Sequence, residues 1–152
     1  MKFSGLTEQQ STALRRGGPD AFGNPAETAV SGGSGNPCRR CLKQVSKGEP
    51  YLNLAHKPFT TTQPYSEIGP IFLCKSCKSD PDGSLPQVLT TSPDYLLKAY
   101  SSDERIVYGT GAITPASNIS SYAASLLARE DVAFVDARSS KNNCWLARIT
   151  RQ

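Results

Sequence analysis

The chain has 152 residues, the length of one ordinary domain, and its 17 basic and 13 acidic residues leave a modest net charge of +4. Leu, Ile, Val and Phe make up about a fifth of the sequence, so the core is small, and 12 glycines and 11 prolines predict many loops. No apolar run approaches the ~18 residues of a membrane span, and the first residues lack the apolar core of a signal peptide. We therefore expect a cytoplasmic protein with reduced thiols, and neither a membrane protein nor a secreted one.

Few large apolar residues occur before Pro37, so this N-terminal part is expected to be rich in loop. Residues 7–16 favour a short helix, because the Thr7 hydroxyl can accept a hydrogen bond from a free N–H in the first turn. That helix would end at Gly17-Gly18. Residues 17–37 are dominated by glycine, proline and polar residues, which predict an extended loop.

Two strands are predicted in the middle of the chain. Residues 49–56 alternate between two faces, and residues 68–74 contain a short apolar run. Residues 78–94 hold three prolines and an Asp-Gly pair, which predict a loop.

The last third of the chain predicts a hairpin, a helix and a second hairpin. Residues 95–100 and 105–110 are rich in β-forming residues and are joined by four residues, which is typical of a hairpin. Residues 118–130 carry one continuous apolar stripe and predict the main helix. Residues 131–138 and 144–150 predict two further strands. The expected fold is therefore α+β, with an antiparallel sheet built from hairpins and packed against one main helix.

The clearest chemical signal is a pair of C-x-x-C motifs, formed by Cys38 with Cys41 and by Cys74 with Cys77. Each motif can direct two thiolates at one point, and two motifs together give the tetrahedral set of four cysteines that Zn²⁺ prefers. The gap of 32 residues is longer than the ~15–20 of the simplest four-cysteine modules. It holds both predicted middle strands, however, and their antiparallel pairing would bring the motifs together. We therefore predict a structural zinc ion bound by Cys38, Cys41, Cys74 and Cys77.

Three other interpretations of these cysteines stay open. Reduced thiols can pack as small buried apolar groups. A redox dithiol is a second possibility, because the arginines between Cys38 and Cys41 would favour a thiolate, although the βαβ setting typical of such motifs is missing. Disulfides are the third, and they would require an oxidising compartment.

The fifth cysteine and the single histidine offer weaker signals. Cys144 is expected to pack beside Leu146, and His56 is expected to end a strand. The alternative is a thiol nucleophile that uses His56 as its base. Neither a nucleophile elbow nor a phosphate-binding glycine loop is present, so the sequence indicates no specific enzyme.

Basic residues gather within and beside the two motifs. They are Arg39, Arg40, Lys43, Lys47, Lys75 and Lys78. A basic zinc module could bind nucleic acid through phosphate contacts. We favour solvated side chains that offset the net negative charge of four thiolates on Zn²⁺, because no recognition helix or aromatic stacking surface is evident near them.

Six strings of the sequence are together similar to one family. They are Arg16-Gly17-Gly18-Pro19-Asp20-Ala21, Pro37-Cys38-Arg39-Arg40-Cys41-Leu42, Gly48-Glu49-Pro50-Tyr51-Leu52, Gln63-Pro64-Tyr65-Ser66-Glu67-Ile68-Gly69-Pro70-Ile71-Phe72, Arg105-Ile106-Val107-Tyr108-Gly109-Thr110-Gly111 and Arg138-Ser139-Ser140-Lys141-Asn142-Asn143-Cys144. On these strings the chain resembles the bacterial domain-of-unknown-function family number 1203 over nearly its whole length. In that family the position matching Cys74 is often His, and Cys and His exchange as zinc ligands, so the resemblance implies a shared metal site. It implies no activity.

These observations predict one domain over residues 1–152. Its parts are a loop-rich segment over 1–37, a zinc-clamped β segment over 38–94, and a hairpin–helix–hairpin over 95–152. Our first hypothesis is a binding or accessory protein whose zinc stabilises the fold. The alternatives are a nucleic-acid-binding zinc module and a thiol- or metal-dependent enzyme. The candidate residues for an enzyme are Cys144, His56, Tyr65, Glu67 and Arg105.

Overall fold

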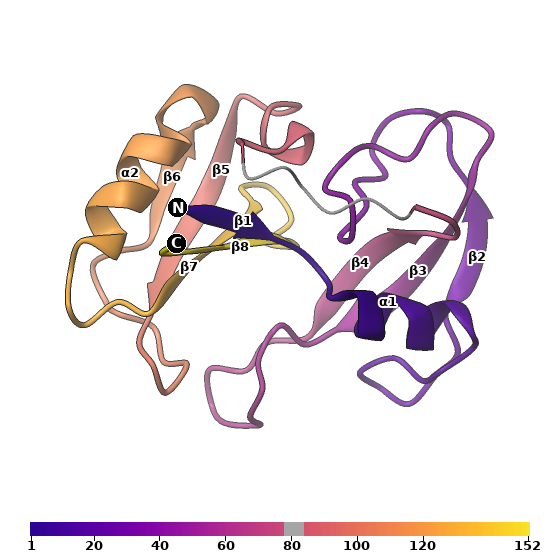
Figure 1. The fold of residues 1–152 in the computed structure, drawn as a ribbon, viewed down its shortest axis with the longest axis horizontal. Coiled ribbons are helices and arrows are strands. Elements are labelled where there is room, and N and C mark those ends of the chain that lie inside the picture. Colours follow the sequence, from indigo (N-terminus) through magenta and orange to yellow (C-terminus); the bar gives the residue numbers. More distant parts are fainter. Residues whose placement is uncertain (78–83) are drawn as a thin grey trace.

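The computed structural model describes residues 1–77 and 84–152, and it has an α+β fold with two antiparallel sheets (Figure 1). In spatial order, the strands of the five-stranded sheet are β1 (Lys2–Ser4), β8 (Trp145–Thr150), β7 (Phe134–Ser139), β5 (Asp94–Tyr100) and β6 (Ala112–Pro115). The strands of the three-stranded sheet are β2 (Glu27–Val30), β3 (Pro50–His56) and β4 (Gly69–Cys74). The predicted fold class is confirmed, but the strands form two sheets where one was expected.

The two ends of the chain meet in the larger sheet (Figure 1). Strand β1 pairs antiparallel with β8, so that Phe3 lies opposite Ile149. The short 3-10 helix η2 (Ala116–Asn118) leads into α2 (Ile119–Leu127), which buries the predicted apolar stripe against this sheet. The main helix is therefore confirmed, with its end at Leu127.

The smaller sheet carries the N-terminal helix α1 (Glu8–Arg15) at its side (Figure 1). The predicted cap is present, because Gln10 N–H donates to Thr7 Oγ1 at 3.2 Å and the Gln10 side chain accepts from Thr7 N–H at 2.9 Å. The predicted middle strands are also present as the β3–β4 hairpin, with Leu54 opposite Ile71.

The prediction of uninterrupted loop over residues 17–37 is wrong, since β2 lies within this range and pairs with β3. Three of its four residues, Glu27, Thr28 and Val30, are exposed, so the sequence shows no alternation of buried and exposed positions there. Strand β1 was not predicted either. It has three residues, and its only strand partner among the described residues is at the other end of the chain.

The predicted pairing of residues 95–100 with 105–110 is formed only next to the turn, where Tyr100 and Ile106 form an antiparallel bridge and Val107 N–H donates to the Ala99 carbonyl at 2.9 Å. Along the rest of this edge β5 pairs with β6 instead. Glu104, in the turn after β5, has a positive φ of 62°. Its carboxylate accepts hydrogen bonds from the backbone N–H groups of Thr60 and Thr61, so this turn is bound to the loop after β3. The hydroxyl of Thr110 then accepts a hydrogen bond from Ala99 N–H at 3.1 Å, in place of a backbone carbonyl. Regular pairing therefore begins only at β6.

Two large apolar clusters fill the fold, one at each sheet. The cluster of the larger sheet includes Leu42 together with Val88 and Leu89 of the 3-10 helix η1 (Gln87–Leu89). The cluster of the smaller sheet includes Cys38, Cys41 and, from the larger sheet, Trp145. Leu42 and Cys41 are neighbours in sequence but pack in different clusters, so the first C-x-x-C motif lies at the junction of the two cores.

The predicted loop over residues 78–94 is described only from residue 84, and it contains η1; residues 78–83 lie outside the described part of the chain. Within residues 1–77 and 84–152, no helix has the length and apolar character needed to cross a membrane.

Candidate functional site

The structure brings the cysteines of the two C-x-x-C motifs into one cluster. Their four sulfur atoms all lie within 4.8 Å of one another. Cys38 Sγ is 3.6 Å from Cys77 Sγ, and Cys41 Sγ is 3.9 Å from Cys74 Sγ. Each close pair joins one motif to the other, and all four cysteines are free thiols.

The spacing of the sulfur atoms fits a metal site. Four Zn–S bonds of about 2.3 Å in a tetrahedron place the sulfurs about 3.8 Å apart. The separations of these two pairs, 3.6 and 3.9 Å, lie on either side of this value. A disulfide would need about 2.0 Å. The cluster could therefore hold one metal ion through all four sulfurs.

Strand β4 positions both motifs. Cys74 is the last residue of β4, and the first motif lies beside this strand, where Arg39 N–H donates to the Phe72 carbonyl at 2.9 Å. The backbone N–H groups of Arg40 and Cys74 each donate to Cys38 Sγ at 3.3 Å. Hydrogen bonds from the Cys41 thiol first, and then from the other two thiols and Cys74 N–H, lower the pKa of Cys38. Cys38 is thus prepared to carry the negative charge that a metal ligand needs.

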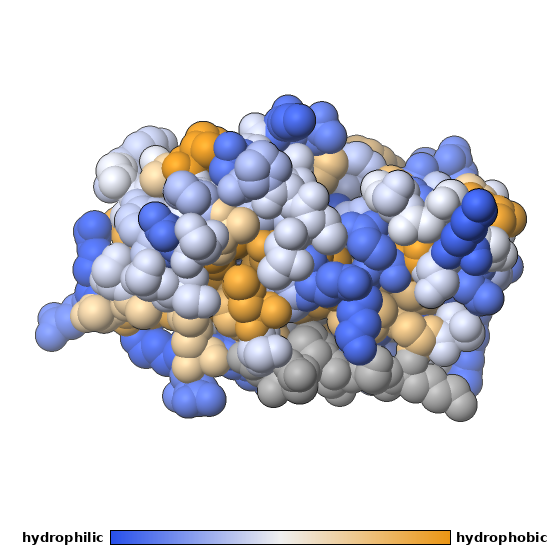
Figure 2. Space-filling model, turned by 90° about the horizontal axis from the view of Figure 1, so that it is seen from above, coloured by the Kyte–Doolittle hydropathy of each residue, from blue (hydrophilic) through white to orange (hydrophobic). Residues whose placement is uncertain are grey.

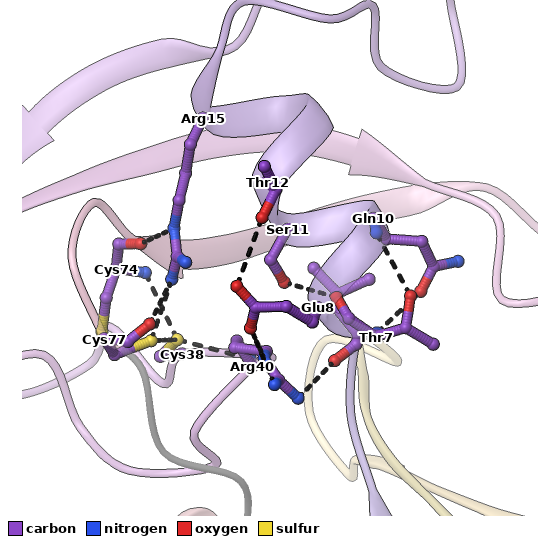
Figure 3. A network of polar contacts seen from close by, with 11 residues as sticks. Thr7, Glu8, Gln10, Ser11, Thr12, Arg15, Cys38, Arg40, Cys74 and Cys77 are labelled. Atoms are coloured by element: carbon purple, nitrogen blue, oxygen red, sulfur yellow. Dashed lines mark hydrogen bonds and ion pairs between the residues drawn. The ribbon is translucent and has the colours of Figure 1, made fainter.

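Helix α1 connects to both motifs from one side (Figure 3). At its N-terminal end, Glu8 forms an ion pair of 2.9 Å with Arg40, which lies inside the first motif. At its C-terminal end, Arg15 donates to the carbonyl oxygens of Cys74 and Cys77, both at 2.9 Å, and to Cys77 Sγ at 3.1 Å. The helix therefore holds the two motifs together from outside the cluster.

Arg39 links the first motif to the larger sheet. Its guanidinium is buried and donates to the carbonyl of Trp145 on β8 at 2.6 Å and to the carbonyl of Pro37. Burial lowers the pKa of Arg39 to about 10, against the opposing effects of Cys144 and Cys38, so the side chain stays charged at neutral pH. The Arg39 carbonyl also accepts from Leu6 N–H at 2.6 Å.

The basic residues near the motifs do not form the solvated set that we favoured. Arg39 and Arg40 are buried, with 2% and 6% of their surface exposed. Their partners are protein carbonyls and, for Arg40, Glu8. Lys43, Lys47 and Lys75 are exposed, and Lys78 lies outside the described residues. The exposed positive charge at the described part of this site therefore comes from three lysines.

Three of the five enzyme candidates line one pocket at the meeting point of the two sheets. This junction pocket has a volume of about 390 Å³. Its lining comes from the end of β3 and the β3–β4 loop on one side, and from the β7–β8 turn on the other: His56, Pro58, Glu67, Ile68, Gly69, Pro70, Arg138, Asn142, Asn143, Cys144 and Trp145. The sequence did not single out Arg138 as a functional residue, because Asp136 and Arg138 alternate with apolar residues in β7, which is typical of a strand with one exposed face.

The other two candidates lie outside the lining of this pocket. The Arg105 guanidinium is 5.4 Å from the centre of the Tyr65 ring, and the Tyr65 hydroxyl is 3.3 Å from that of Tyr108. Tyr108 is largely exposed. The thiol of Cys144 donates to the carbonyl of Asn142 at 3.7 Å and, within the described part of the chain, forms no hydrogen bond with His56. The nucleophile-and-base arrangement is therefore not formed.

Comparison with known proteins gives one match. The model of a family described as a protein of unknown function (DUF1203) matches residues 35–151. No curated protein and no solved structure matches the chain.

Proposed function

Because the chain belongs to the DUF1203 family, which brings no activity with it, we propose its role from the cysteine cluster: a binding or accessory protein whose fold is stabilised by a structural zinc ion. Cys38, Cys41, Cys74 and Cys77 are the proposed ligands. The observation that carries this proposal is the position of all four sulfur atoms within 4.8 Å of one another. Four cysteine thiolates are one of the usual donor sets of structural zinc sites.

The surroundings of the cluster support a structural role for the ion. The cluster joins β4, the N-terminal helix and, through Arg39, strand β8 of the other sheet. A metal ion at this junction would stabilise contacts between parts of the chain that are far apart in sequence. Because a preformed site rarely exists in an unfolded chain, the free energy of metal binding would contribute directly to the stability of the fold.

The geometry favours a binding role over the two alternatives. A zinc ion held by four cysteines has no open coordination position, so it would not act as a catalyst. Nucleic-acid binding loses support because two of the basic residues, Arg39 and Arg40, are buried against protein partners. The face in Figure 2 is mainly hydrophilic with separate apolar patches, so a partner bound on that face would make mainly polar contacts.

The proposal is tested by the metal content of the chain and its dependence on the cysteines. We expect one zinc ion per chain in protein purified without chelator. Cys41→Ser should lose the ion and melt about 10 °C or more below the parent protein. Cys144→Ser is the matched control, since Cys144 lies outside the cluster, and it should keep both the ion and the melting temperature. A metal-free chain with the same melting temperature would contradict the proposal.

A further inference from the structure

Two residues that line the junction pocket carry buried hydrogen-bond donors that no described residue satisfies. Arg138 is 3% exposed; its Nη1 group donates to the Asn143 carbonyl at 3.1 Å, but Nε and Nη2 have no partner among the described residues. The indole N–H of Trp145, which lines the same pocket, has none either. These three nitrogen atoms can only donate. The acceptor Glu67 Oε2 lies 2.7 Å from Arg138 Nη1 and is itself without a well-directed hydrogen bond, so a group that satisfies the three donors must supply further acceptor oxygens.

The charges around the pocket leave a positive excess. The Glu67 carboxylate forms ion pairs with two cations. Its Oε2 atom lies 2.7 Å from Arg138 Nη1, and its Oε1 atom lies 3.2 Å from Lys98 Nζ. Asp136 is fully buried and pairs with Arg148 at 2.8 Å. Three cations and two carboxylates thus carry one net positive charge. A buried charge of this kind is costly unless an opposite charge accompanies it.

The neighbouring groups do not reverse this excess. Burial first, and then Arg148 and Arg39, lower the pKa of His56 to about 4, so the imidazole is neutral at neutral pH. The Tyr100 hydroxyl is buried in the same charged region, near Arg138, Asp136 and Glu67. Burial first, against the opposing effect of Arg138, raises the pKa of Tyr100 to about 12, so this phenol also stays neutral.

The shape of the pocket suits a small ligand. Its volume of about 390 Å³ lies in the range of about 300–1,000 Å³ that is usual for small-molecule sites. Pro58, Ile68 and Pro70 supply apolar wall, and the polar groups described above lie among them. The lining combines these apolar residues with polar and charged ones, and polar groups at defined positions fix the orientation of a ligand.

We propose that the junction pocket binds the oxyanion group, a carboxylate or a phosphate, of a small ligand, with Arg138 as the main recognition residue and the Trp145 indole N–H as a second donor. The planar guanidinium of arginine matches both oxyanions with paired hydrogen bonds. The inference deepens the binding role proposed above, since it names the chemical class of the ligand. It does not depend on the chemistry of the zinc ion.

Trp145 is the only tryptophan in the chain, so the fluorescence comes from one residue. Trp145 also lines a second pocket beside Phe59, so the signal of Arg138 Nε–H assigns a response to the junction pocket. The zinc-loaded full-length protein is titrated with sodium phosphate and, separately, with sodium succinate, while sodium chloride keeps the ionic strength constant. We expect a saturable change of Trp145 fluorescence with at least one of them, and an NMR shift of the Trp145 Nε1–H and Arg138 Nε–H signals. A response to phosphate alone identifies a phosphorylated ligand, and a response to succinate alone a carboxylate.

Arg138→Lys tests the recognition residue, because it keeps the positive charge but removes the planar pair of donors. We expect it to weaken oxyanion binding on the order of thirtyfold. Arg151→Lys, an exposed arginine just beyond β8, is the matched control and should bind as the parent protein does. If Arg138→Lys does not fold, Trp145→Phe removes one donor and keeps an aromatic ring, and its weaker binding can be measured by calorimetry.

Two outcomes would overturn the proposal. One is the absence of any saturable response to either oxyanion at millimolar concentration, which would mean that water alone meets these donors. The other is an unchanged affinity in a folded Arg138→Lys variant. Zinc content and melting temperature are measured on the same samples. A protein that keeps both but binds no oxyanion overturns the oxyanion site alone, and loss of zinc with retained binding overturns the metal proposal alone.

Discussion

The guanidinium of Arg15, at the end of α1, lies 3.1 Å from the sulfur of Cys77, at the far end of the second C-x-x-C motif. The same side chain donates to the carbonyl oxygens of Cys74 and Cys77. Arg15 lies outside residues 35–151, which the family model matches, but it touches the candidate metal cluster that lies within them. The N-terminal helix therefore completes the surroundings of the cluster.

Arg15→Met should weaken zinc binding about tenfold or more, because hydrogen bonds from neighbouring groups orient ligands and offset the charge of the thiolates. The affinity is measured by competition with a chromogenic chelator. Arg16→Met is the matched control, since Arg16 is the next residue and is exposed. Equal zinc affinity in both variants would show that Arg15 contributes only to packing.

Gly5→Ala should destabilise the protein by about 3 kcal/mol, because a Cβ atom at this position would lie 1.9 Å from the Arg39 carbonyl oxygen. This close approach lets Leu6 N–H reach the same carbonyl. Gly32→Ala is the control, since a Cβ there meets nothing within 4 Å. Urea unfolding of both variants measures the difference, and equal stabilities would mean that the N-terminal segment moves away without cost.

Glu104→Gln should lower the free energy of unfolding by about 1–2 kcal/mol at neutral pH. Burial raises the pKa of Glu104, but hydrogen bonds from the backbone N–H groups of Thr60 and Thr61 and the Thr61 hydroxyl outweigh it, so the net pKa is lowered. Because the pKa of Glu104 is lower in the folded protein than in the unfolded chain, where it is near 4.5, the carboxylate stabilises the fold at pH values above 4.5. This contribution is lost as the pH falls through the pKa of the folded protein.

The difference in stability between the parent protein and Glu104→Gln should therefore shrink as the pH falls below about 4.5. Urea unfolding at several pH values measures it. Exposed Glu130→Gln should differ little from the parent at every pH. A difference that stays constant down to the lowest pH would contradict the role given to the carboxylate.

His56 should titrate with a pKa of about 4, far below its ordinary value of 6.5, because its imidazole is partly buried and lies near Arg148 and Arg39. Between pH 4 and pH 6.5 the imidazole is protonated in the unfolded chain but neutral in the folded protein, so unfolding takes up a proton. The contribution of His56 to the free energy of unfolding is therefore complete above pH 6.5 and is lost as the pH drops toward 4. NMR of the single imidazole measures the pKa directly, and His56→Gln should lack this part of the pH dependence. A midpoint near 6.5 would contradict the burial of His56.

Short-range patterns predicted the elements that near neighbours determine. Each of these patterns occupies a short window of sequence: the Thr7 cap, the apolar stripe of α2, and the residues that form strands β3 and β4. All three elements are present in the structure. Strands β1 and β2 could not be found in this way. One has three residues and pairs with the other end of the chain, and the other is exposed along most of its length.

The buried arginines could not be placed from the sequence. Arginine is mostly exposed in proteins, so a basic residue beside a cysteine motif is ordinarily assigned to the surface. Arg39 and Arg138 are buried because distant segments provide their partners, the Trp145 carbonyl for one and Glu67 for the other. The spacing of the cysteines predicted their cluster, whereas the junction pocket depends on how the two sheets meet.

X-ray absorption at the zinc edge of the purified protein measures directly whether one zinc ion is bound by four cysteines. We expect a single shell of four sulfur atoms at about 2.3 Å from the ion. A shell that contains nitrogen or oxygen ligands, or protein that carries no stoichiometric zinc, would contradict it.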